Sequence, residues 1–513
     1  MSGAGKVLLV HPPRFYWPFV SEDDNFMIPQ YLPCLGAYIR RKGFAVEIID
    51  CMPEKIGWQS LERRIREARP RVVASGENHV LYASETLRLF EMVKKIDPDI
   101  VTIAGGSHFS NLYEDTLRDH PVDFVVRGEG EETFAELLEE LEKDDPRFER
   151  VASIAFKRED RVLATEARPL IADLTTLPMP AYDLLKPKLY GKAKYLFSPG
   201  GTTIHHSRGC PYSCDFCGWW VQMADTTFDA EGAPTFKPRW RTKSVEQTVE
   251  EVELLRLEYD KRCLVFVDES WNVNKKWNDA FAEALLRKPW KVNWFAFMLS
   301  DCILRDEEAG ILEKLVAAGL THLCIGVERE GDAAREDVGK HHYSREKLEQ
   351  VFDLLRTKYP SVFRQATFIV GVRHETEDLL QRQYEFAKRL RLDFPGFHPI
   401  TPVPGTAYWK EAMRSELLEV RDYNRFDWMT PVSRSEFLTR DEIERHICRM
   451  QQKYVTAGWL LRGILSPYKY KRGMYIWWLI VTLRVAWRSV LDRLSPLDPK
   501  QYSALRRPAW YEW

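Results

Sequence analysis

Hydrophobic positions in the first 142 residues fall into short apolar runs separated by longer segments with helical spacing. Runs over 6–10, 45–49 and 100–104 contain almost no polar residue, whereas 31–42 and 84–96 repeat apolar positions every three to four residues. Continuous short runs are typical of strands buried on both faces of a parallel sheet. The pattern predicts a doubly wound, Rossmann-like domain over residues 1–142, which would bind ligands at the carboxyl ends of its strands.

The same alternation returns after a connector predicted over residues 143–201, which contains two hairpin-like strands and proline-bearing turns. From residue 202 to 406 six apolar runs each precede a segment with helical spacing. The expected strands are 203–206, 263–267, 291–297, 322–328, 365–370 and 396–402. Six such repeats predict a partial (β/α)6 barrel, open on one side, with its chemistry at the carboxyl ends of the strands.

The segment 407–513 is expected to form a mainly helical C-terminal domain. Its apolar run 474–483 has only ten residues, too few to span a bilayer core of about 30 Å. Basic residues flank the run and aromatic residues lie inside it, which suits a helix lying in a membrane interface. A terminal helix that covers the open side of the barrel accounts for the same pattern.

Composition narrows the class of protein. The chain has 513 residues and a net charge of −2, which argues against nucleic acid as the main partner. The chain has nine cysteines and nothing at its N-terminus looks like a secretion signal, so we expect a protein of the reducing cytoplasm. Peripheral contact with a membrane is a further expectation. Seventeen tryptophans suggest large apolar pockets or a lipid-facing surface.

The chemistry centres on three cysteines, Cys210, Cys214 and Cys217, spaced C-x3-C-x2-C in a loop with Gly209 and Pro211. This spacing lets three thiolates converge on one metal group, and three thiolates leave one coordination position open. A chance arrangement, a zinc site completed elsewhere and disulfide bonds are alternative origins of the same spacing.

The Gly-Cys-Pro sequence and the aromatic Phe216 before the last cysteine make this loop resemble the signature of the radical SAM superfamily. The resemblance implies a four-iron four-sulfur cluster, with S-adenosylmethionine on its open iron cleaved to an adenosyl radical. It also implies contacts with S-adenosylmethionine at Phe216 in this loop and, at later strand ends, at Glu269, Ser270, Glu328 and Gly371. One departure is that Asp268-Glu269-Ser270 stands where the superfamily usually has Gly-Gly-Glu.

The dinucleotide fingerprint G-x-G-x-x-G is missing after the first expected strand of the N-terminal domain. Instead, His-Pro-Pro (11–13) after the first strand, Gly-Gly-Ser-His (105–108) after the fourth and Arg-Gly-Glu-Gly-Glu (127–131) after the fifth resemble the cobalamin-binding domain that precedes many radical SAM domains. The motifs that carry this resemblance imply cobalamin contacts at His11, Pro12, Gly105, Gly106, Ser107, Gly128 and Glu129. The Asp-x-His-x-x-Gly pattern that puts a histidine on cobalt in other cobalamin domains is absent. Therefore either cobalt has no histidine ligand from this domain, or the domain has lost its cofactor. His79 and His108 are weaker candidates for cofactor contact.

Together these features predict a cobalamin-dependent radical SAM enzyme that methylates an unactivated carbon of a bulky apolar small molecule, with flavodoxin or ferredoxin as electron donor. Residues 422–428 and the helix expected over 440–457 resemble the terminal domain of the anaerobic magnesium-protoporphyrin IX monomethyl ester cyclase branch. Oxygen-independent oxidation and ring closure on a porphyrin ester is therefore an alternative reaction. Radical bond formation on a lipid and a non-catalytic, cofactor-sensing protein are further alternatives.

Overall fold

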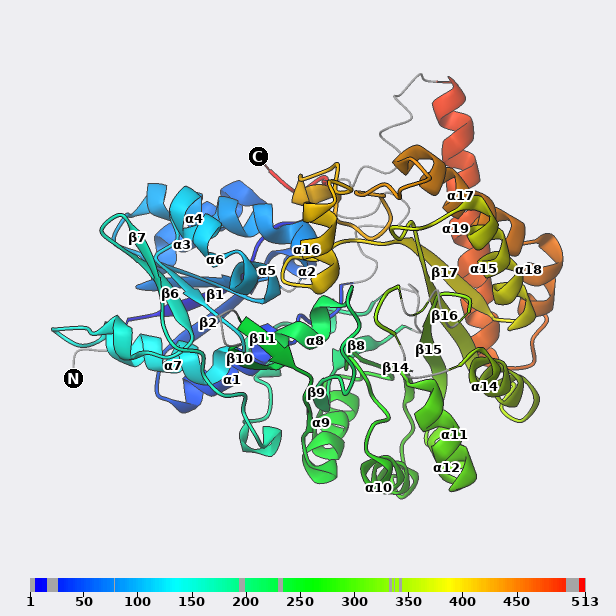
Figure 1. Cartoon of the computed structure of the whole chain (residues 1–513). Coiled ribbons are helices and arrows are strands. Elements are labelled where there is room, and N and C mark those ends of the chain that lie inside the picture. The colour runs from blue at the N-terminus through cyan, green and yellow to red at the C-terminus, as the bar shows by residue number, and fades with distance from the viewer. Residues whose placement is uncertain are drawn as a thin grey trace.

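The structure is a computed structural model that describes residues 5–15, 26–77, 79–192, 199–228, 234–331, 335, 337–340, 344–494 and 507–512. Parts of the predicted connector (193–198) and of the predicted C-terminal domain (495–506) lie outside these residues. Figure 1 shows the N-terminal domain in blue to cyan beside the barrel in green to yellow.

The N-terminal sheet has the strand order β2-β1-β3-β4-β5-β6-β7, and its first five strands are parallel. The strands are β1 (Val7–His11), β2 (Val46–Asp50), β3 (Val72–Gly76), β4 (Val101–Gly105), β5 (Phe124–Val126), β6 (Ile154–Arg158) and β7 (Arg161–Ala164). The helices of this domain are α1 (Tyr31–Arg41), α2 (Cys51–Glu54), α3 (Trp58–Ala68), α4 (Ala83–Ile96), α5 (Ser107–Asn111), α6 (Tyr113–Asp119) and α7 (Gly130–Leu141). The order 2-1-3-4-5 is that of a doubly wound sheet, so the predicted fold class is confirmed.

The antiparallel hairpin β6–β7 lies in the predicted connector but completes the N-terminal sheet. Val126 of β5 pairs with Ile154, so β6 continues the ladder beyond β5. The buried residues Ile154 and Phe156 join the core of this domain. The N-terminal unit therefore extends past the expected boundary at residue 142, because a hairpin that follows a helix carries no local signal of the sheet it will join.

The second sheet has six parallel strands in the order β17-β16-β15-β14-β13-β8, which confirms the partial (β/α)6 barrel. Its strands are β8 (Gly201–Ile204), β13 (Cys263–Phe266), β14 (Asn293–Phe297), β15 (Leu320–Glu328), β16 (Phe363–Val370) and β17 (Phe394–Pro399). The helices between them are α9 (Val245–Leu257), α10 (Lys275–Leu286), α11 (Ser300–Glu308), α12 (Ile311–Ala317), α14 (Arg345–Thr357) and α15 (Glu377–Arg389). Both sheets contribute to one continuous apolar core.

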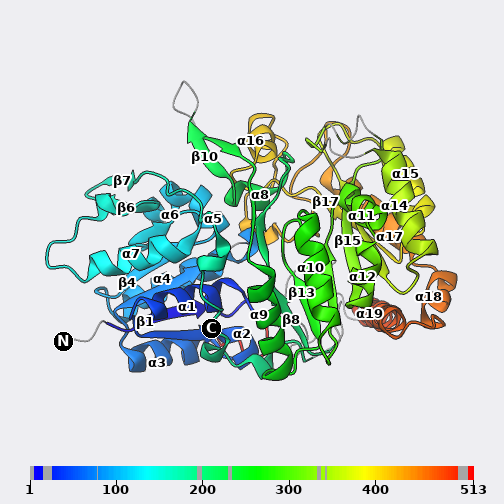
Figure 2. The same ribbon diagram turned by 90° about the horizontal axis from the view of Figure 1, so that it is seen from below.

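In the described part of the chain after the barrel there are four further helices: α16 (Ala407–Arg414), α17 (Arg440–Tyr454), α18 (Ala457–Ile464) and α19 (Lys469–Leu494). Figure 2 shows α18 and α19 beside the barrel and away from the N-terminal domain. Trp478 of α19 stacks on Phe394 with ring centroids 4.2 Å apart, and the Tyr475 hydroxyl donates to Asp393 at 2.9 Å. The inner face of α19 thus packs near the amino-terminal end of β17.

The last described segment, 507–512, returns to the N-terminal domain. The Tyr511 hydroxyl donates to the buried carboxylate of Glu85 at 2.8 Å, and the backbone amide of Trp58 donates to the Tyr511 carbonyl at 2.9 Å. The chain therefore closes back on its first domain after passing the barrel.

Candidate functional site

The cysteine loop runs from β9 (Ser207–Gly209) to α8 (Gly218–Gln222) at the carboxyl end of β8. Gly209 has φ +87°, and a Cβ built there would lie 1.9 Å from the carbonyl oxygen of Arg239, so only glycine fits. The indole N–H of Trp220 donates to the Cys214 carbonyl at 2.9 Å, which fixes the middle of the loop. The loop is therefore a built turn between a strand and a helix.

The three thiols are free and lie in a partly apolar setting. Burial raises the pKa of Cys214 to about 11 and that of Cys217 to about 12, and it also raises the pKa of Cys210. A bound cationic cluster favours the thiolates and reverses this effect of burial. Within the described residues no three metal-ligating side chains converge on a single ion. A four-iron cluster binds each cysteine through a separate iron, so the cysteines fit a cluster better than a lone zinc ion.

Residues that follow β13 form hydrogen bonds with β9, the strand that enters the cysteine loop. The Glu269 carboxylate accepts from the Gly209 amide at 2.9 Å, and the Ser270 hydroxyl lies 3.2 Å from the Cys210 sulfur. Asp268 accepts from the Ser207 amide and hydroxyl, both at 2.6 Å, and burial raises its pKa to about 7. The predicted residues Glu269 and Ser270 therefore lie beside Cys210, as a contact to S-adenosylmethionine on the cluster requires.

Glu328 ends β15 in a strained backbone conformation. Its φ is +61°, which is uncommon for a residue other than glycine and is typical of functional sites. Its carboxylate is 3.0 Å from the Lys340 ammonium and 3.4 Å from the Thr367 hydroxyl, and the residue is buried. The charge of Lys340 also acts on the thiols of Cys210 and Cys214, so Glu328 lies near the cysteine loop.

The other two residues predicted to contact S-adenosylmethionine have packing roles as well. The Gly371 amide donates to Glu375 at 3.1 Å, and Ile443 of α17 lies against its α-carbon. Phe216 is half-buried against an apolar cluster that includes Ile369. Their contact with the cofactor stays a prediction.

The predicted cobalamin edge of the N-terminal sheet contains several buried polar atoms that have no hydrogen-bond partner among the described residues. They are His11 Nε2, Tyr31 Oη, Ser75 Oγ and His108 Nδ1. His11 is held by Asp50 at 2.9 Å through Nδ1, and Asp50 also accepts from the Tyr190 hydroxyl at 2.7 Å. Buried polar groups are normally satisfied, so this edge fits a large polar ligand such as cobalamin.

The loops around this edge include the remaining predicted cobalamin residues. Pro12 and Ser107 are buried, the Gly105 carbonyl accepts from the Glu77 amide at 2.9 Å, and the Gly128 amide donates to Ser110 at 3.1 Å. A Cβ at Gly106 (φ +90°) would lie 2.5 Å from the backbone of Glu77, so the β4–α5 turn requires glycine. Of the two weaker candidates, His108 belongs to the unpartnered set above, and His79 lies against Trp428.

Glu129, whose predicted contact with cobalamin stays a prediction, lies in a buried network of ion pairs. Its carboxylate pairs with Arg208 and Arg241, both at 2.8 Å, and Arg208 also pairs with Glu131. Burial disfavours the charged form of Glu129, but the two arginines outweigh burial and lower its pKa. Arg208 and Arg241 were missed by sequence reasoning, since a pair across 79 residues has no local signal.

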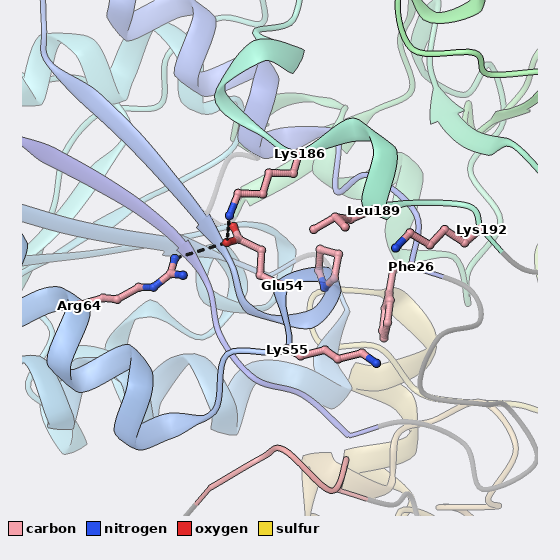
Figure 3. A pocket seen from close by; sticks show the side chains of 8 residues that line it. Phe26, Glu54, Lys55, Arg64, Lys186, Leu189 and Lys192 are labelled. Atoms are coloured by element: carbon pink, nitrogen blue, oxygen red, sulfur yellow. Dashed lines mark hydrogen bonds and ion pairs between the residues drawn. The ribbon is translucent and has the colours of Figure 1, made fainter.

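Two cavities differ in their relation to these residues. One, of about 340 Å³, is lined by Phe26, Pro53, Glu54, Lys55, Arg64, Lys186, Leu189 and Lys192, and Figure 3 shows Glu54 between Lys186 and Arg64. It contains none of the predicted site residues. The other is small and lies between the domains, lined by His79, Val80, Ser107, Gly218, Trp219, Val403, Phe426 and Trp428.

A doubly wound domain with an unsatisfied polar edge, followed by a partial barrel with a three-cysteine loop, is the architecture expected of a radical enzyme that also binds cobalamin. The B12 binding domain model matches residues 18–138, and the Radical SAM superfamily model matches residues 204–387. The chain is thus a cobalamin-binding member of the radical SAM superfamily, and its cofactors are an iron–sulfur cluster, S-adenosylmethionine and cobalamin.

Known proteins with the same architecture cover most of the chain. It is 28% identical to an uncharacterized methyltransferase of Pyrococcus horikoshii over 86% of this chain and 90% of that protein. It is 27% identical to the anaerobic magnesium-protoporphyrin IX monomethyl ester cyclase of Rubrivivax gelatinosus over 85% and 75% of the two chains. Among solved structures, the radical S-adenosylmethionine methyltransferase TsrM of Kitasatospora setae has the same fold, with a TM-score of 0.68, 15% identity and coverage of 94% and 99%.

Proposed function

We propose that this enzyme transfers a methyl group to an unactivated carbon of a bulky apolar substrate. The observation that carries the proposal is the cavity between the domains, which Ser107 of the predicted cobalamin edge and Gly218 of the cysteine loop line together. When bound, the cluster and S-adenosylmethionine supply an adenosyl radical, and cobalamin supplies a methyl group. A substrate in this cavity would lie within reach of both cofactors.

Different sets of residues in this chain would bind the different cofactors. Cys210, Cys214 and Cys217 would hold the cluster, and Glu269, Ser270 and Glu328 would orient S-adenosylmethionine beside it. The unpartnered polar atoms of the N-terminal edge, including His11 Nε2, would hold cobalamin. Apolar side chains around the cavity, such as Val80 and Val403, exclude water from a reactive radical.

The test uses the full-length protein, reconstituted anaerobically with iron, sulfide and hydroxocobalamin. Methylation consumes two molecules of S-adenosylmethionine, so turnover should release S-adenosylhomocysteine and 5′-deoxyadenosine in equal amounts. Oxidative cyclisation, which the similarity to the porphyrin ester cyclase favours as the second candidate, releases 5′-deoxyadenosine alone. Substrate-dependent 5′-deoxyadenosine without S-adenosylhomocysteine would therefore overturn methylation and support the cyclase.

The electron donor is proposed to be a flavodoxin or a ferredoxin. Cys210 and Cys217 are only partly buried, which supports a short path from a docked protein to the cluster. Reduced flavodoxin should replace dithionite in forming 5′-deoxyadenosine. The assignment would be contradicted if dithionite supported activity but neither reduced flavodoxin nor reduced ferredoxin did.

Peripheral membrane contact is proposed through the outer face of α18 and α19. No described helix is long and apolar enough to cross a bilayer. Among the described side chains, the exposed apolar residues on these helices and just after α18 are Leu461, Leu465, Ile476, Ile480, Leu483 and Trp487, and Lys469 is exposed at the start of α19. Exposed apolar side chains with basic neighbours suit the surface of an anionic membrane.

Flotation with anionic and with neutral vesicles tests this contact. Leu483→Asp should release the protein from anionic vesicles because it places a charge on the proposed contact face. Leu257→Asp is the matched control, since Leu257 is similarly exposed (55% against 59%) but lies on α9. Equal release by both variants, or no flotation of the wild type, would remove the proposal.

A further inference from the structure

Trp428 has an unusual backbone conformation at the junction of the two domains. Its φ is +57°, a region that bulky residues rarely adopt and that tends to mark functional sites. The turn is held in place by Asp427, whose carboxylate accepts from the amides of Met429 at 2.9 Å and Thr430 at 2.6 Å. The surrounding structure thus maintains a conformation that the residue itself disfavours.

The Trp428 side chain lies between groups from both cofactor domains. Its ring centroid is 4.3 Å from that of His79, which follows β3, and 5.8 Å from that of Trp219, which follows the last cysteine. Burial and the nearby Arg14 lower the pKa of His79 to about 4, so its ring is neutral at pH 7. Three flat rings from three parts of the chain therefore meet around one cavity.

Trp219 differs from the buried tryptophans of the barrel. Trp271 and Trp294 are fully buried in an aromatic core with Phe266 and Phe281, and they act in packing. Trp219 is 38% exposed and lines the cavity, although it lies only two residues after Cys217. Part of its surface is therefore available to a ligand beside the cluster.

The cavity is closed in this conformation. Its volume is about 20 Å³, room for roughly one water, whereas a bulky ligand needs several hundred Å³. Polar groups are few in its lining, which is mostly aromatic and aliphatic. A bulky substrate can enter only if part of this lining moves, and Trp428 is the lining residue with a strained backbone.

We propose that Trp428 and Trp219 form the walls of the substrate site, that Trp428 moves to admit the substrate, and that the substrate is a planar, conjugated ring system. This inference rests on the proposed function and specifies its substrate class. The planes of Trp219 and Trp428 lie at 70° to each other, so a flat π-system between them could stack on one ring and meet the other edge to face. A saturated polycyclic substrate has no π-face to match these walls.

Binding to the full-length protein, without S-adenosylmethionine, tests the inference. The probe is protoporphyrin IX monomethyl ester, followed by the shift of its absorbance band, and cholestanol as a competitor represents saturated polycycles. Trp428→Ala and Trp219→Ala should each weaken porphyrin binding about tenfold, whereas Trp428→Phe should weaken it by less than about threefold. Cholestanol should not displace the porphyrin.

Trp290→Ala is the matched control, because Trp290 lies before the amino-terminal end of β14, at the opposite end of the barrel from the cysteine loop. A thermal melt of each variant shows whether it is folded, and Trp428→Phe keeps the test valid if Trp428→Ala is not. Wild-type affinity in Trp428→Ala and Trp219→Ala, displacement by cholestanol, or no porphyrin binding by the wild type would each overturn the inference. These outcomes are independent of methyl transfer, which the release of S-adenosylhomocysteine tests separately.

Discussion

Replacing Arg208 by methionine removes one of the two cations that pair with the N-terminal domain near the cysteine loop, the other being Arg241. Arg208 lies two residues before Cys210 and pairs with Glu129 and Glu131, whose side chains are only 5% and 8% exposed. Glu129 keeps Arg241 as a partner in the variant. Glu131 keeps no cation within the described part of the chain, so one buried carboxylate loses its compensation.

The expected cost follows from this burial. Removing one partner of a buried ion pair typically destabilises a protein by about 3–5 kcal/mol, because the remaining charge stays buried. We expect Arg208→Met to lower the free energy of unfolding by about 3 kcal/mol, at the lower end of that range, since Glu129 keeps Arg241 as its partner. The control Arg158→Met breaks a pair with Glu149 whose side chains are 63% and 48% exposed, and it should cost only about 0–1 kcal/mol.

Urea unfolding followed by tryptophan fluorescence measures both variants. Iron per chain after anaerobic reconstitution adds a local readout, because loss of the ion pairs of Arg208 should misplace Cys210 and lower iron loading. The double variant Arg208→Met/Glu131→Met replaces the pair by apolar side chains and should regain much of the lost stability. If Arg208→Met costs no more than Arg158→Met, the ion pairs do not hold the loop and the reasoning is refuted.

Three further predictions concern the cluster, a buried histidine and the strained tryptophan. Cys214→Ala should abolish both iron loading and 5′-deoxyadenosine formation, and retained cleavage of S-adenosylmethionine would show that the cluster lies elsewhere. Burial lowers the pKa of His108 to about 4 from 6.5, so the stability that its neutral form provides is full above about pH 6.5 and is lost as the pH falls through about 4. The free energy of unfolding should therefore fall less between pH 7 and pH 4 in His108→Phe than in the wild type, by up to about 3 kcal/mol. The same fall in both proteins would contradict this. Trp428→Gly should be about 1 kcal/mol more stable than Trp428→Ala in the same assay, because glycine adopts positive φ without strain, and equal stability would show that the turn is not strained.

Local sequence patterns predicted the parts of this molecule that depend on neighbours along the chain. The apolar runs predicted both parallel sheets, since a strand buried on both faces leaves a continuous hydrophobic signal. The cysteine spacing predicted the cluster loop because Cys210, Cys214 and Cys217 all lie within eight residues of the chain. The β6–β7 hairpin could not be assigned to its sheet, because its partner β5 is identified only by tertiary packing.

The number of tryptophans in the chain does not show which of them line a cavity. The high tryptophan content suggested large apolar pockets or a lipid-facing surface, yet Trp271 and Trp294 are fully buried in the core and only Trp219 of these three is partly exposed. Burial depends on which helix covers each side chain, and no local pattern separates a core tryptophan from one beside a cavity. Trp428 carried no signal of its own, because its left-handed backbone is imposed by the turn around it.

The relative position of the two cofactor domains depends on contacts that are distant in sequence. Glu129 and Arg208 are 79 residues apart, and Glu85 and Tyr511 are 426 residues apart. The first pair fixes the strand that enters the cysteine loop, and the second returns the end of the chain to the N-terminal domain. Trp428 contacts His79 of the N-terminal domain and Trp219 of the segment that follows the cysteine loop, so its environment depends on how the two domains pack. A change in the ion pairs should therefore alter both the cysteine loop and the size of the cavity, which couples cluster assembly to substrate entry.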